Sequence, residues 1–506
     1  MKPVISTSPD RVRTPLRIDF PRIGTIRPRS AAEIGPSSWT LGCETLDRDF
    51  ADWDEYKDYV APLGLKTIRL QAGWAKCERV KGKYDFAWLD HIVDDAIARG
   101  LDPILETGYG NPVYPGGGGF DLAGGFPVSE EGLAGWDAWI DAMARHFAGR
   151  VRDWFMWNEP DIPPGDGSAP KTPQDIATFN VRTARIVKRN IPGARIAGLS
   201  LAHNSPEFLE ECIRALGADA SLFDWFIYHG YAEAPESSYE NVEAQKGVVA
   251  RLAPHARLRQ GENGCPSEMA HCFALHRIPW SEFSQAKWDL RRMVGDLGHG
   301  VESSIFTICD FNHRGREINR KGLLRADEDH RVIGVKRAWY AVQNLASVFG
   351  GKEWTPTALR SVDLSLSAYG FKRGLDFAPG APSPGRADLR ETPLFAFWTH
   401  GRAFVSPAAT GDAPGIHAPE PDIRVMPYER PGDSFETRPT VLEDMGGEPL
   451  SDPVWVDLLS GRVYAFPAEN VVPCRDRVRY LDVPVYDSPC LLAERAALAW
   501  DRLPTT

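Results

Sequence analysis

Two segments of the chain carry a glutamate directly after a run rich in apolar residues. VRDWFMWNEPD (151–161) contains Asn158 and Glu159, and ARLRQGENG (256–264) contains Glu262. Cleavage of a glycosidic bond needs such a pair, because one carboxyl must protonate the leaving oxygen while the anomeric carbon is attacked from the opposite face. One carboxyl must stay protonated near neutral pH and the other ionised, which different surroundings can arrange. These residues predict acid–base chemistry on a sugar if the fold brings the two segments together.

The choice of these two glutamates rests on their positions. The tripeptide Asn158-Glu159-Pro160 is short enough to occur by chance, so its place at the end of a predicted strand is what supports it. Glu262 has two competitors nearby. Glu268 lies six residues beyond the strand in a polar loop, and Glu302 begins a strand and would lie at its opposite end.

Other polar and aromatic residues stand at or just after the ends of predicted strands. We expect them to bind the sugar, although each could equally be structural: Glu44, Trp74, Glu106, His203, His229 and Asp310. Tryptophan faces can stack on the C–H face of a pyranose, and the candidates are Trp74, Trp157, Trp280 and Trp288, of which the last also fits a helix face. Glu78 fits a loop salt bridge as well as a substrate contact.

No metal or other cofactor is expected. His203, His229, Asp310 and His313 could hold a metal at the strand ends. A metal-dependent barrel hydrolase usually presents a His-x-His pair on its first strand, and SSWTLGCE (37–44) has none.

The elements that must position these residues alternate between β-rich runs and amphipathic helical stretches from about residue 38 to 350. Helical spacing of apolar residues predicts a helix over 50–60, Gly100 is an expected helix stop, and Ser129 and Thr172 are expected N-caps. Eight strand–helix units with right-handed crossovers form an α/β fold, the (β/α)8 TIM barrel, with its active site at the C-terminal ends of the strands. The predicted strands are 37–44, 66–74, 101–110, 151–161, 195–203, 222–231, 256–264 and 302–310.

Beyond about residue 351 helical periodicity stops and Pro, Gly and β-forming residues dominate. The segments 393–405, 453–466 and 478–494 predict strands of a C-terminal all-β sandwich domain, and 376–390 predicts a loop within it. The predicted organisation is an N-terminal extension (1–36) that could add a strand to the β domain, a catalytic barrel (37–350) and an accessory β-sandwich (351–506).

The barrel segment, roughly residues 37–350, resembles the clan A glycoside hydrolases. These enzymes carry an Asn-Glu pair on the fourth strand, matched by Asn158-Glu159-Pro160, and a Glu on the seventh, where Glu262-Asn263-Gly264 resembles family 1. WAKCERVKGKYDFAWLDHIV (74–93) resembles the pattern after the second strand in families 35, 39 and 42. The two motifs point to different families, so the family stays open.

The resemblance implies a retaining β-glycosidase that acts through a covalent glycosyl-enzyme. We expect action at chain ends, although the sequence does not distinguish it from internal cleavage. The resemblance also implies that Glu159 is the general acid/base, Glu262 the nucleophile and Asn158 a donor to the sugar 2-hydroxyl. Arg69 would keep the nucleophile ionised, or be a barrel ion pair, and Tyr231 would hydrogen-bond it. The alternatives are a transglycosidase with the same residues and a non-catalytic sugar-binding barrel, against which the presence of both glutamates counts.

Composition limits the partners. The chain of 506 residues has 58 basic and 69 acidic residues, a net charge of -11 and no basic run, so nucleic acid is not an expected partner. No window reaches the about 18 apolar residues of a membrane span, and Pro and Arg interrupt the N-terminus before a signal sequence could form. Eight scattered cysteines predict free thiols. We expect a cytoplasmic protein that binds a carbohydrate or glycoside, and a homo-oligomer is compatible with the sequence.

Overall fold

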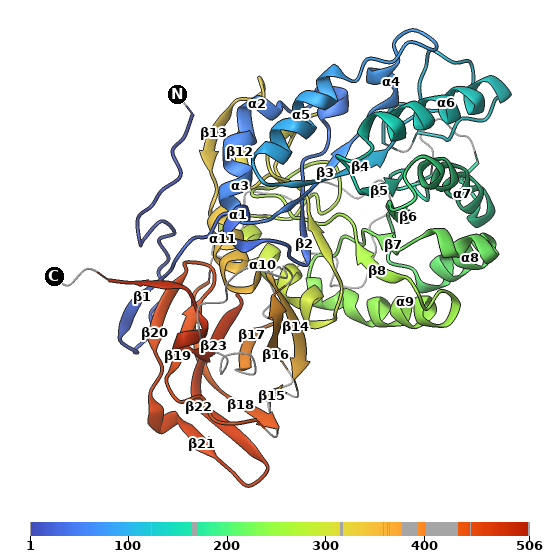
Figure 1. Ribbon diagram of the computed structural model, residues 1–506. Coiled ribbons are helices and arrows are strands. Elements are labelled where there is room, and N and C mark those ends of the chain that lie inside the picture. The colour runs from blue at the N-terminus through green and yellow to red at the C-terminus, as the bar shows by residue number, and fades with distance from the viewer. Residues whose placement is uncertain are drawn as a thin grey trace, which may run out of the picture.

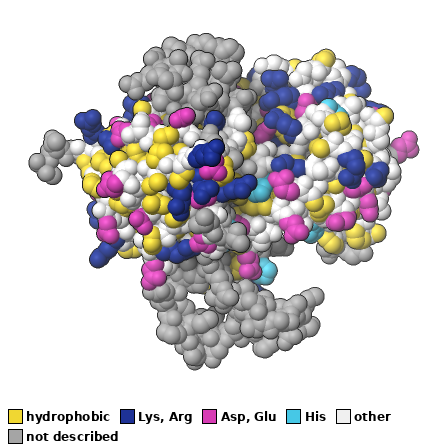
Figure 2. All heavy atoms as spheres, turned by 90° about the horizontal axis from the view of Figure 1, so that it is seen from below, with side chains coloured by type: hydrophobic (Ala, Val, Ile, Leu, Met, Phe, Trp, Pro, Cys, Tyr) yellow, Lys and Arg dark blue, Asp and Glu magenta, His cyan; other side chains and the backbone are white. Residues whose placement is uncertain are grey.

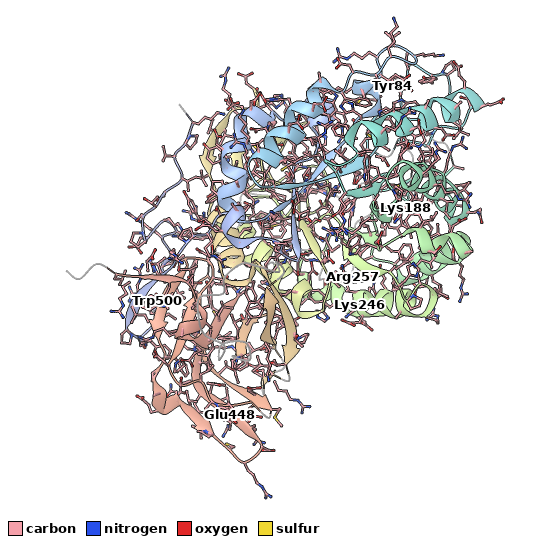
Figure 3. The ribbon with its side chains drawn as sticks, in the orientation of Figure 1. Tyr84, Lys188, Lys246, Arg257, Glu448 and Trp500 are labelled. Carbon is pink, nitrogen blue, oxygen red and sulfur yellow. The ribbon has the colours of Figure 1, made fainter. Side chains whose placement is uncertain are left out.

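The computed structural model describes residues 2–122, 124–163, 169–313, 317–357, 359–361, 363, 365–376, 393–400, 434–445 and 447–503. A barrel of strands ringed by helices occupies one part of the molecule, and β-sheets that contain both the first strand and the C-terminal strands occupy the other (Figure 1). Tyr84 and Glu448 lie at opposite ends of the molecule, on the barrel and the β-sheets respectively (Figure 3).

Eight parallel strands make the barrel, and each lies inside a predicted strand segment. Bridges from Arg259 to Glu302 and from Asn263 to Ile305 join the two end strands and nearly close it. The predicted TIM barrel is therefore confirmed. In sheet order the strands are β8 (Arg257–Gln260), β7 (Trp225–Tyr228), β6 (Arg195–Leu201), β5 (Asp153–Met156), β4 (Asp102–Thr107), β3 (Thr67–Gln71), β2 (Trp39–Gly42) and β9 (Ser303–Ile305).

The helices around the barrel begin and end largely where the sequence predicts. The Ser129 hydroxyl accepts from the Gly132 amide, Thr172 forms a capping box with Asp175, and Gly100 has a left-handed φ of +78° just past its helix. The main helices are α5 (Ala87–Ala98), α6 (Glu130–Phe147), α7 (Pro173–Asn190), α8 (Pro206–Leu216), α9 (Tyr239–Leu252), α10 (Glu282–Gly298) and α11 (Arg337–Phe349).

The predicted helix over 50–60 is interrupted. It divides into α2 (Trp53–Tyr56), a 3-10 turn (Lys57–Tyr59) and α3 (Val60–Leu63). Pro62 accounts for the break, because it has no N–H to donate to the carbonyl of Asp58 four residues earlier and its ring crowds that carbonyl.

Two antiparallel sheets follow the barrel and share a buried apolar core. Phe397, Trp455 and Leu492 of the larger sheet pack with Leu442 and Tyr480 of the smaller one, which confirms the predicted sandwich. The larger sheet has the order β14 (Lys352–Thr357), β16 (Leu366–Asp376), β17 (Pro393–Thr399), β23 (Cys490–Glu494), β19 (Pro453–Asp457), β20 (Arg462–Ala465), β1 (Arg22–Ile26) and β24 (Trp500–Arg502). The smaller has β15 (Leu359–Ser361), β18 (Arg438–Met445), β22 (Arg477–Val485) and β21 (Val471–Pro473).

The N-terminal segment contributes β1 to the larger sheet, between β20 and β24. The domain boundaries near residues 36 and 350 stay predictions, and the predicted loop 376–390 lies outside the described residues except for Asp376. Six of the eight cysteines are buried, and no disulfide joins any of the eight. None of the helices in the described part of the chain is both long and apolar enough to cross a bilayer. On the face shown in Figure 2, basic and acidic side chains are interspersed.

A buried ion pair joins the barrel to the sandwich. Lys287 of α10 donates to the Asp487 carboxylate at 2.7 Å and to the Ser434 carbonyl at 2.6 Å, and its ammonium lies 4.3 Å from the centre of the Phe435 ring. The Lys287 side chain is buried and that of Asp487 is 15% exposed, so water solvates the two charges little and each stabilises the other.

We predict that Lys287→Met lowers the free energy of unfolding by about 3 kcal/mol, because it leaves the Asp487 carboxylate buried without its cation. Urea unfolding of wild type and variant at pH 7 measures this difference. Arg331→Met is the matched control, since the Arg331–Asp329 pair is more than 60% exposed on both sides and should contribute less than about 1 kcal/mol. Equal effects of the two substitutions would contradict the prediction.

Candidate active site

A left-handed turn after β5 directs Glu159 into the mouth of the barrel. Trp157 has a φ of +59° and Glu159 a φ of +49°, a conformation that costs about 1–2 kcal/mol for residues other than glycine. Hydrogen bonds across the barrel hold it: the Trp157 amide donates to the Thr107 carbonyl and the Glu159 amide to the Ser200 carbonyl, each at 2.9 Å. The neighbouring strands therefore fix the direction of Glu159.

Two glycines allow the segment after β8 to fit between its neighbours. A Cβ on Gly261 would lie 2.2 Å from the Ile227 side chain, and one on Gly264 would lie 2.0 Å from the Phe306 carbonyl oxygen. Glu262 stands between these glycines, at the same end of the barrel as Glu159. Glycine is therefore required on both sides of Glu262 because a larger residue would collide with Ile227 or Phe306.

Arg69 of β3 is fully buried and faces three carboxylates. Its guanidinium lies 2.7 Å from Glu262 Oε2, 3.0 Å from Glu106 Oε2 and 3.5 Å from Glu44 Oε1. It also donates to Asn158 Oδ1 at 3.0 Å and to the Gly261 carbonyl at 2.7 Å. Arg69 is therefore both a barrel ion pair and a direct partner of the predicted nucleophile, so the two readings of the sequence are not exclusive.

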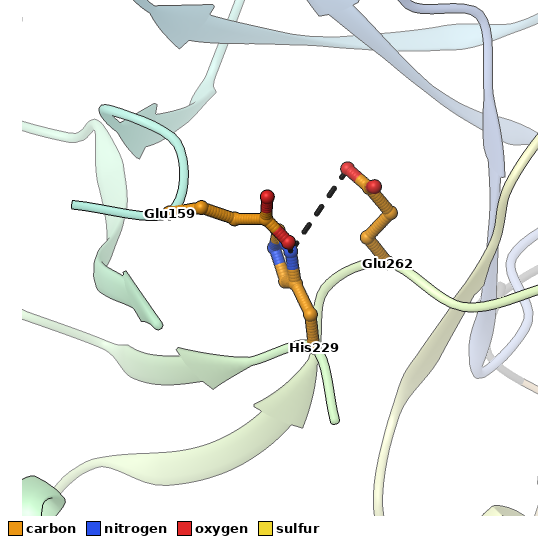
Figure 4. A group of neighbouring side chains, drawn as sticks. All are labelled: Glu159, His229 and Glu262. Atoms are coloured by element: carbon orange, nitrogen blue, oxygen red, sulfur yellow. Dashed lines mark hydrogen bonds and ion pairs between the residues drawn. The ribbon is translucent and has the colours of Figure 1, made fainter. Parts of the chain in front are cut away.

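Glu159 and Glu262 point toward each other with His229 beside them (Figure 4). One carboxylate oxygen of each glutamate and a ring nitrogen of His229 all lie within 4.8 Å of one another. His229 Nδ1 lies 2.8 Å from Glu159 Oε1 and 4.0 Å from Glu262 Oε2. The Tyr231 hydroxyl donates to Glu262 Oε1 at 3.0 Å.

The surroundings shift the two pKa values in opposite directions. Burial raises the pKa of Glu159 above its ordinary value, and the hydrogen bond from His229 only partly offsets this. Burial acts on Glu262 too, but attraction by Arg69 and His229, with hydrogen bonds from Arg69 and Tyr231, outweighs it and lowers its pKa. One carboxyl is disposed to hold a proton and the other to stay ionised.

A cavity of about 590 Å³ opens above these glutamates, within the size range of small-molecule sites. Glu159, Glu262 and Tyr231 line it, as does His203, which is exposed and pairs with Asp161 at 2.7 Å. Glu44 and Glu106 lie around Arg69 rather than on the cavity wall. Their positions indicate that Glu44 and Glu106 bind Arg69 rather than contact the sugar as predicted.

Several other predicted contacts do not agree with the geometry. Trp74 is fully buried, with Tyr114 and Trp139 stacked on it, because the short α4 (Trp74–Cys77) turns it into the core. Asp310 is buried and pairs with Lys336 at 2.6 Å and with Arg320. The remaining stacking candidates, Trp157, Trp280 and Trp288, are at most 2% exposed.

The other glutamates weighed as candidates also have structural partners. Glu78 accepts hydrogen bonds from the Trp74 indole and the Tyr114 hydroxyl. Glu268 pairs with Arg320 and Arg325. Glu302 pairs with Arg257 and Arg259 at the starts of the strands.

Sequence reasoning missed two residues at the site. Tyr109, whose hydroxyl accepts from Asn158 Nδ2 at 2.9 Å, lies at the end of the third predicted strand (101–110) and just past β4, so the strand-end rule could have found it. Lys321 lines the cavity from a loop about 60 residues after Glu262, and no local signal pointed to it.

Most of the atoms that could bind a metal have partners within the protein, although His229 Nε2 has none in the part of the chain that the structure describes. Glu159, His229 and Glu262 form the one group of this kind among the described residues. His229 Nδ1 contacts Glu159, while both oxygens of Glu262 are bound by Arg69 and Tyr231. We therefore keep a metal-independent site as a prediction.

We predict that Arg69→Met lowers the free energy of unfolding at pH 7 by about 3–5 kcal/mol, since it strands buried carboxylates without their cation. Glu44→Gln should not lower it. The pKa of Glu44 is raised to about 8, chiefly by burial, so folding at pH 7 requires its protonation. The glutamine variant does not have this free-energy cost of protonating Glu44. The cost also vanishes near pH 4, because Glu44 is then protonated in the unfolded chain as well.

Urea unfolding at pH 4 and pH 7 checks both substitutions. The glutamine variant should be at least as stable as wild type at pH 7, and any advantage should shrink toward pH 4. A large loss of stability in Glu44→Gln at pH 7 would show that Glu44 is an ionised partner of Arg69.

Comparison with known proteins finds sequence similarity in the first part of the barrel. A glycoside hydrolase family 42 model, described as beta-galactosidase, matches residues 44–115. Beta-galactosidase BgaA from Clostridium cellulovorans is 31% identical over 61 residues, which is 12% of this chain and 9% of that protein. The chain thus aligns with less than a tenth of this curated relative. The family match includes residues 74–93, whose pattern resembles families 35, 39 and 42.

Solved structures share the fold over most of the chain. A family 39 glycoside hydrolase from Bacteroides cellulosilyticus WH2 matches with a TM-score of 0.58 and 16% identity, covering 91% of this chain and 81% of that one. A monomeric beta-xylosidase from Caulobacter crescentus CB15 matches with a TM-score of 0.53 and 16% identity, covering 93% and 97%. At these identities the likeness concerns the fold. The chain resembles the clan A glycoside hydrolases in sequence and in fold, as predicted, which supports a glycoside hydrolase of this clan without assigning it to one family.

Proposed function

We propose that this protein is a retaining β-glycosidase with Glu262 as nucleophile and Glu159 as general acid/base. The observation that carries the proposal is the approach of their carboxylate oxygens to within 4.8 Å, together with the opposite shifts of their pKa values. Retaining enzymes hold the two carboxyl groups about 5–5.5 Å apart, whereas inverting enzymes leave roughly 6.5–9.5 Å for a water molecule.

The reaction then takes two displacements. In the first, the Glu262 carboxylate bonds to the anomeric carbon while the glycosidic oxygen leaves with the proton of Glu159. In the second, Glu159 takes a proton from water, whose oxygen replaces Glu262 at the anomeric carbon. His229 orients Glu159, and Arg69 and Tyr231 stabilise the Glu262 carboxylate each time it is released.

The sugar would be held at the cavity wall. Asn158 uses one amide N–H on Tyr109 and keeps a second that can donate to the 2-hydroxyl. We propose removal of terminal sugars, which is supported by the beta-galactosidase and beta-xylosidase names of the relatives. Transglycosylation by the same residues would appear as new products when an acceptor sugar is added.

A panel of aryl β-glycosides, with release of the aryl group as readout, tests the proposal. Proton NMR at early times should show the β-anomer of the free sugar before mutarotation. An α-anomer would contradict retention. Sugar binding without release of any aryl group would favour the non-catalytic barrel.

Glu262→Ala should lose activity by a factor of about 10⁴ or more, because no covalent intermediate can form. Azide or formate should restore turnover and give a product of inverted configuration, since the small anion fills the vacated space. Glu268→Ala is the matched control and should keep near-native activity. Near-native activity of Glu262→Ala without added anion would place the nucleophile elsewhere.

Glu159→Ala should affect substrates according to how much protonation their leaving groups need. A dinitrophenyl glycoside should still form the glycosyl-enzyme quickly and show a burst, while a disaccharide should be almost inert. The basic limb of the wild-type pH profile reflects loss of the Glu159 proton above its raised pKa, so it should disappear in the variant. Equal losses on both substrates with an unchanged basic limb would make Glu159 a structural residue.

A further inference from the structure

Lys321 is a buried lysine in the wall of the cavity that also contains Glu159 and Glu262. It lies between the short strands β11 (Ile318–Asn319) and β12 (Leu324–Ala326) and is 3% exposed. Its ammonium lies 5.7 Å from the centre of the Tyr231 ring, whose hydroxyl binds Glu262. This places the charge on the nucleophile side of the cavity, where a reacting sugar ring would lie.

The ammonium of Lys321 has no hydrogen-bond acceptor or carboxylate partner among the described residues. The titratable groups that act on it are Cys265, Glu262, Cys272 and Glu317. Glu262 is held by Arg69 and Tyr231, and Glu317 accepts from the backbone amides of His271 and Cys272. Both carboxylates attract Lys321, but neither lies within the 4.0 Å of an ion pair with its ammonium.

Two other buried lysines show how this chain normally compensates such a charge. Lys336 pairs with Asp310 at 2.6 Å, and Lys287 pairs with Asp487 at 2.7 Å. Burial without a partner is costly for an ammonium group, and it lowers the pKa of Lys321 to about 8. Lys321 is also the only lysine or arginine among the described residues that line this cavity. A cation without an ion-pair partner at the wall of a ligand cavity can pair with an anionic group of a bound ligand.

We propose that Lys321 binds an anionic group on the sugar held beside Glu262, so that the preferred substrate is an acidic glycoside carrying a carboxylate or a sulfate ester. The proposal rests on the proposed function for catalysis, but the binding of an acidic sugar does not depend on turnover. A neutral sugar could accept a hydrogen bond from Lys321, but it would leave the buried charge uncompensated.

The test compares matched pairs of sugars that differ in the anionic group. Isothermal titration calorimetry with glucuronate against glucose, galacturonate against galactose, and glucose 6-sulfate against glucose measures binding without chemistry. The corresponding aryl β-glycosides give the ratio of kcat/KM for the acidic over the neutral member. Comparison of the carboxylate pairs with the sulfate pair shows which of the two anionic groups Lys321 binds.

Wild type should prefer the acidic member of at least one pair, and Lys321→Gln should reduce that preference on the order of 10- to 100-fold, the worth of a charge-assisted hydrogen bond. Lys321→Arg should retain much of it. The matched control is Lys246→Gln on α9 (Figure 3), a lysine that pairs with Glu243, does not line the cavity and should leave the preference unchanged. In wild type, affinity for the acidic sugar should fall as pH rises above about 8, because the ammonium loses its proton.

The outcomes separate this inference from the proposed function. Tighter binding of an acidic sugar that Lys321→Gln weakens would support the inference even if no glycoside were hydrolysed, a result that would overturn only the proposed function. Hydrolysis confined to neutral glycosides, or an acidic preference unaltered in Lys321→Gln, would overturn the inference and leave the proposed function intact. If the glutamine variant failed to fold, a wild-type affinity for acidic sugars that is constant from pH 6 to 10 would overturn it as well.

Discussion

The buried guanidinium of Arg69 is the interaction on which the site depends. It is a single cation at the centre of Glu44, Glu106 and Glu262. Three ionised carboxylates around one arginine would leave excess negative charge in a medium that solvates it poorly. The structure resolves this by keeping Glu262 charged through its 2.7 Å contact with Arg69, while burial raises the pKa values of Glu44 and Glu106. The protein therefore uses Arg69 chiefly to hold the carboxylate nearest the cavity.

The same constraint explains why the two facing glutamates differ. Glu262 has Arg69 and Tyr231 as partners, whereas Glu159 has a histidine whose own proton depends on its neighbours. His229 lies between them, 2.8 Å from one and 4.0 Å from the other, so it favours Glu159 geometrically while its charge also stabilises Glu262. Two chemically identical side chains thus have pKa values shifted in opposite directions, and an acid–base reaction needs that difference.

Lys321 adds a second cation at the site, and its surroundings differ from those of Arg69. Arg69 is surrounded by carboxylates, but Lys321 meets the aromatic face of Tyr231 and the open cavity. Arg69 therefore pairs with carboxylates of the protein, whereas the ammonium of Lys321 can pair with an anionic group of a ligand. The barrel makes this division possible because the segments after β5, β6, β7 and β8 line the cavity, while the longer loop after β9 brings Lys321 into its wall.

The sequence by itself determined the barrel, the sandwich and the two central glutamates. Strand length, apolar runs and helix caps such as Ser129 and Thr172 are local signals, and parallel strands with right-handed crossovers place all strand ends at one edge. Tertiary structure alone decided which way each strand-end side chain points. Trp74 turns into the core and Asp310 pairs with Lys336, although both stand at strand ends as Glu159 does. Lys321 reaches the cavity from a loop distant in sequence, and no carboxylate of the described residues lies within ion-pair distance of it. Such contacts join residues far apart in the chain, so local patterns carry no trace of them.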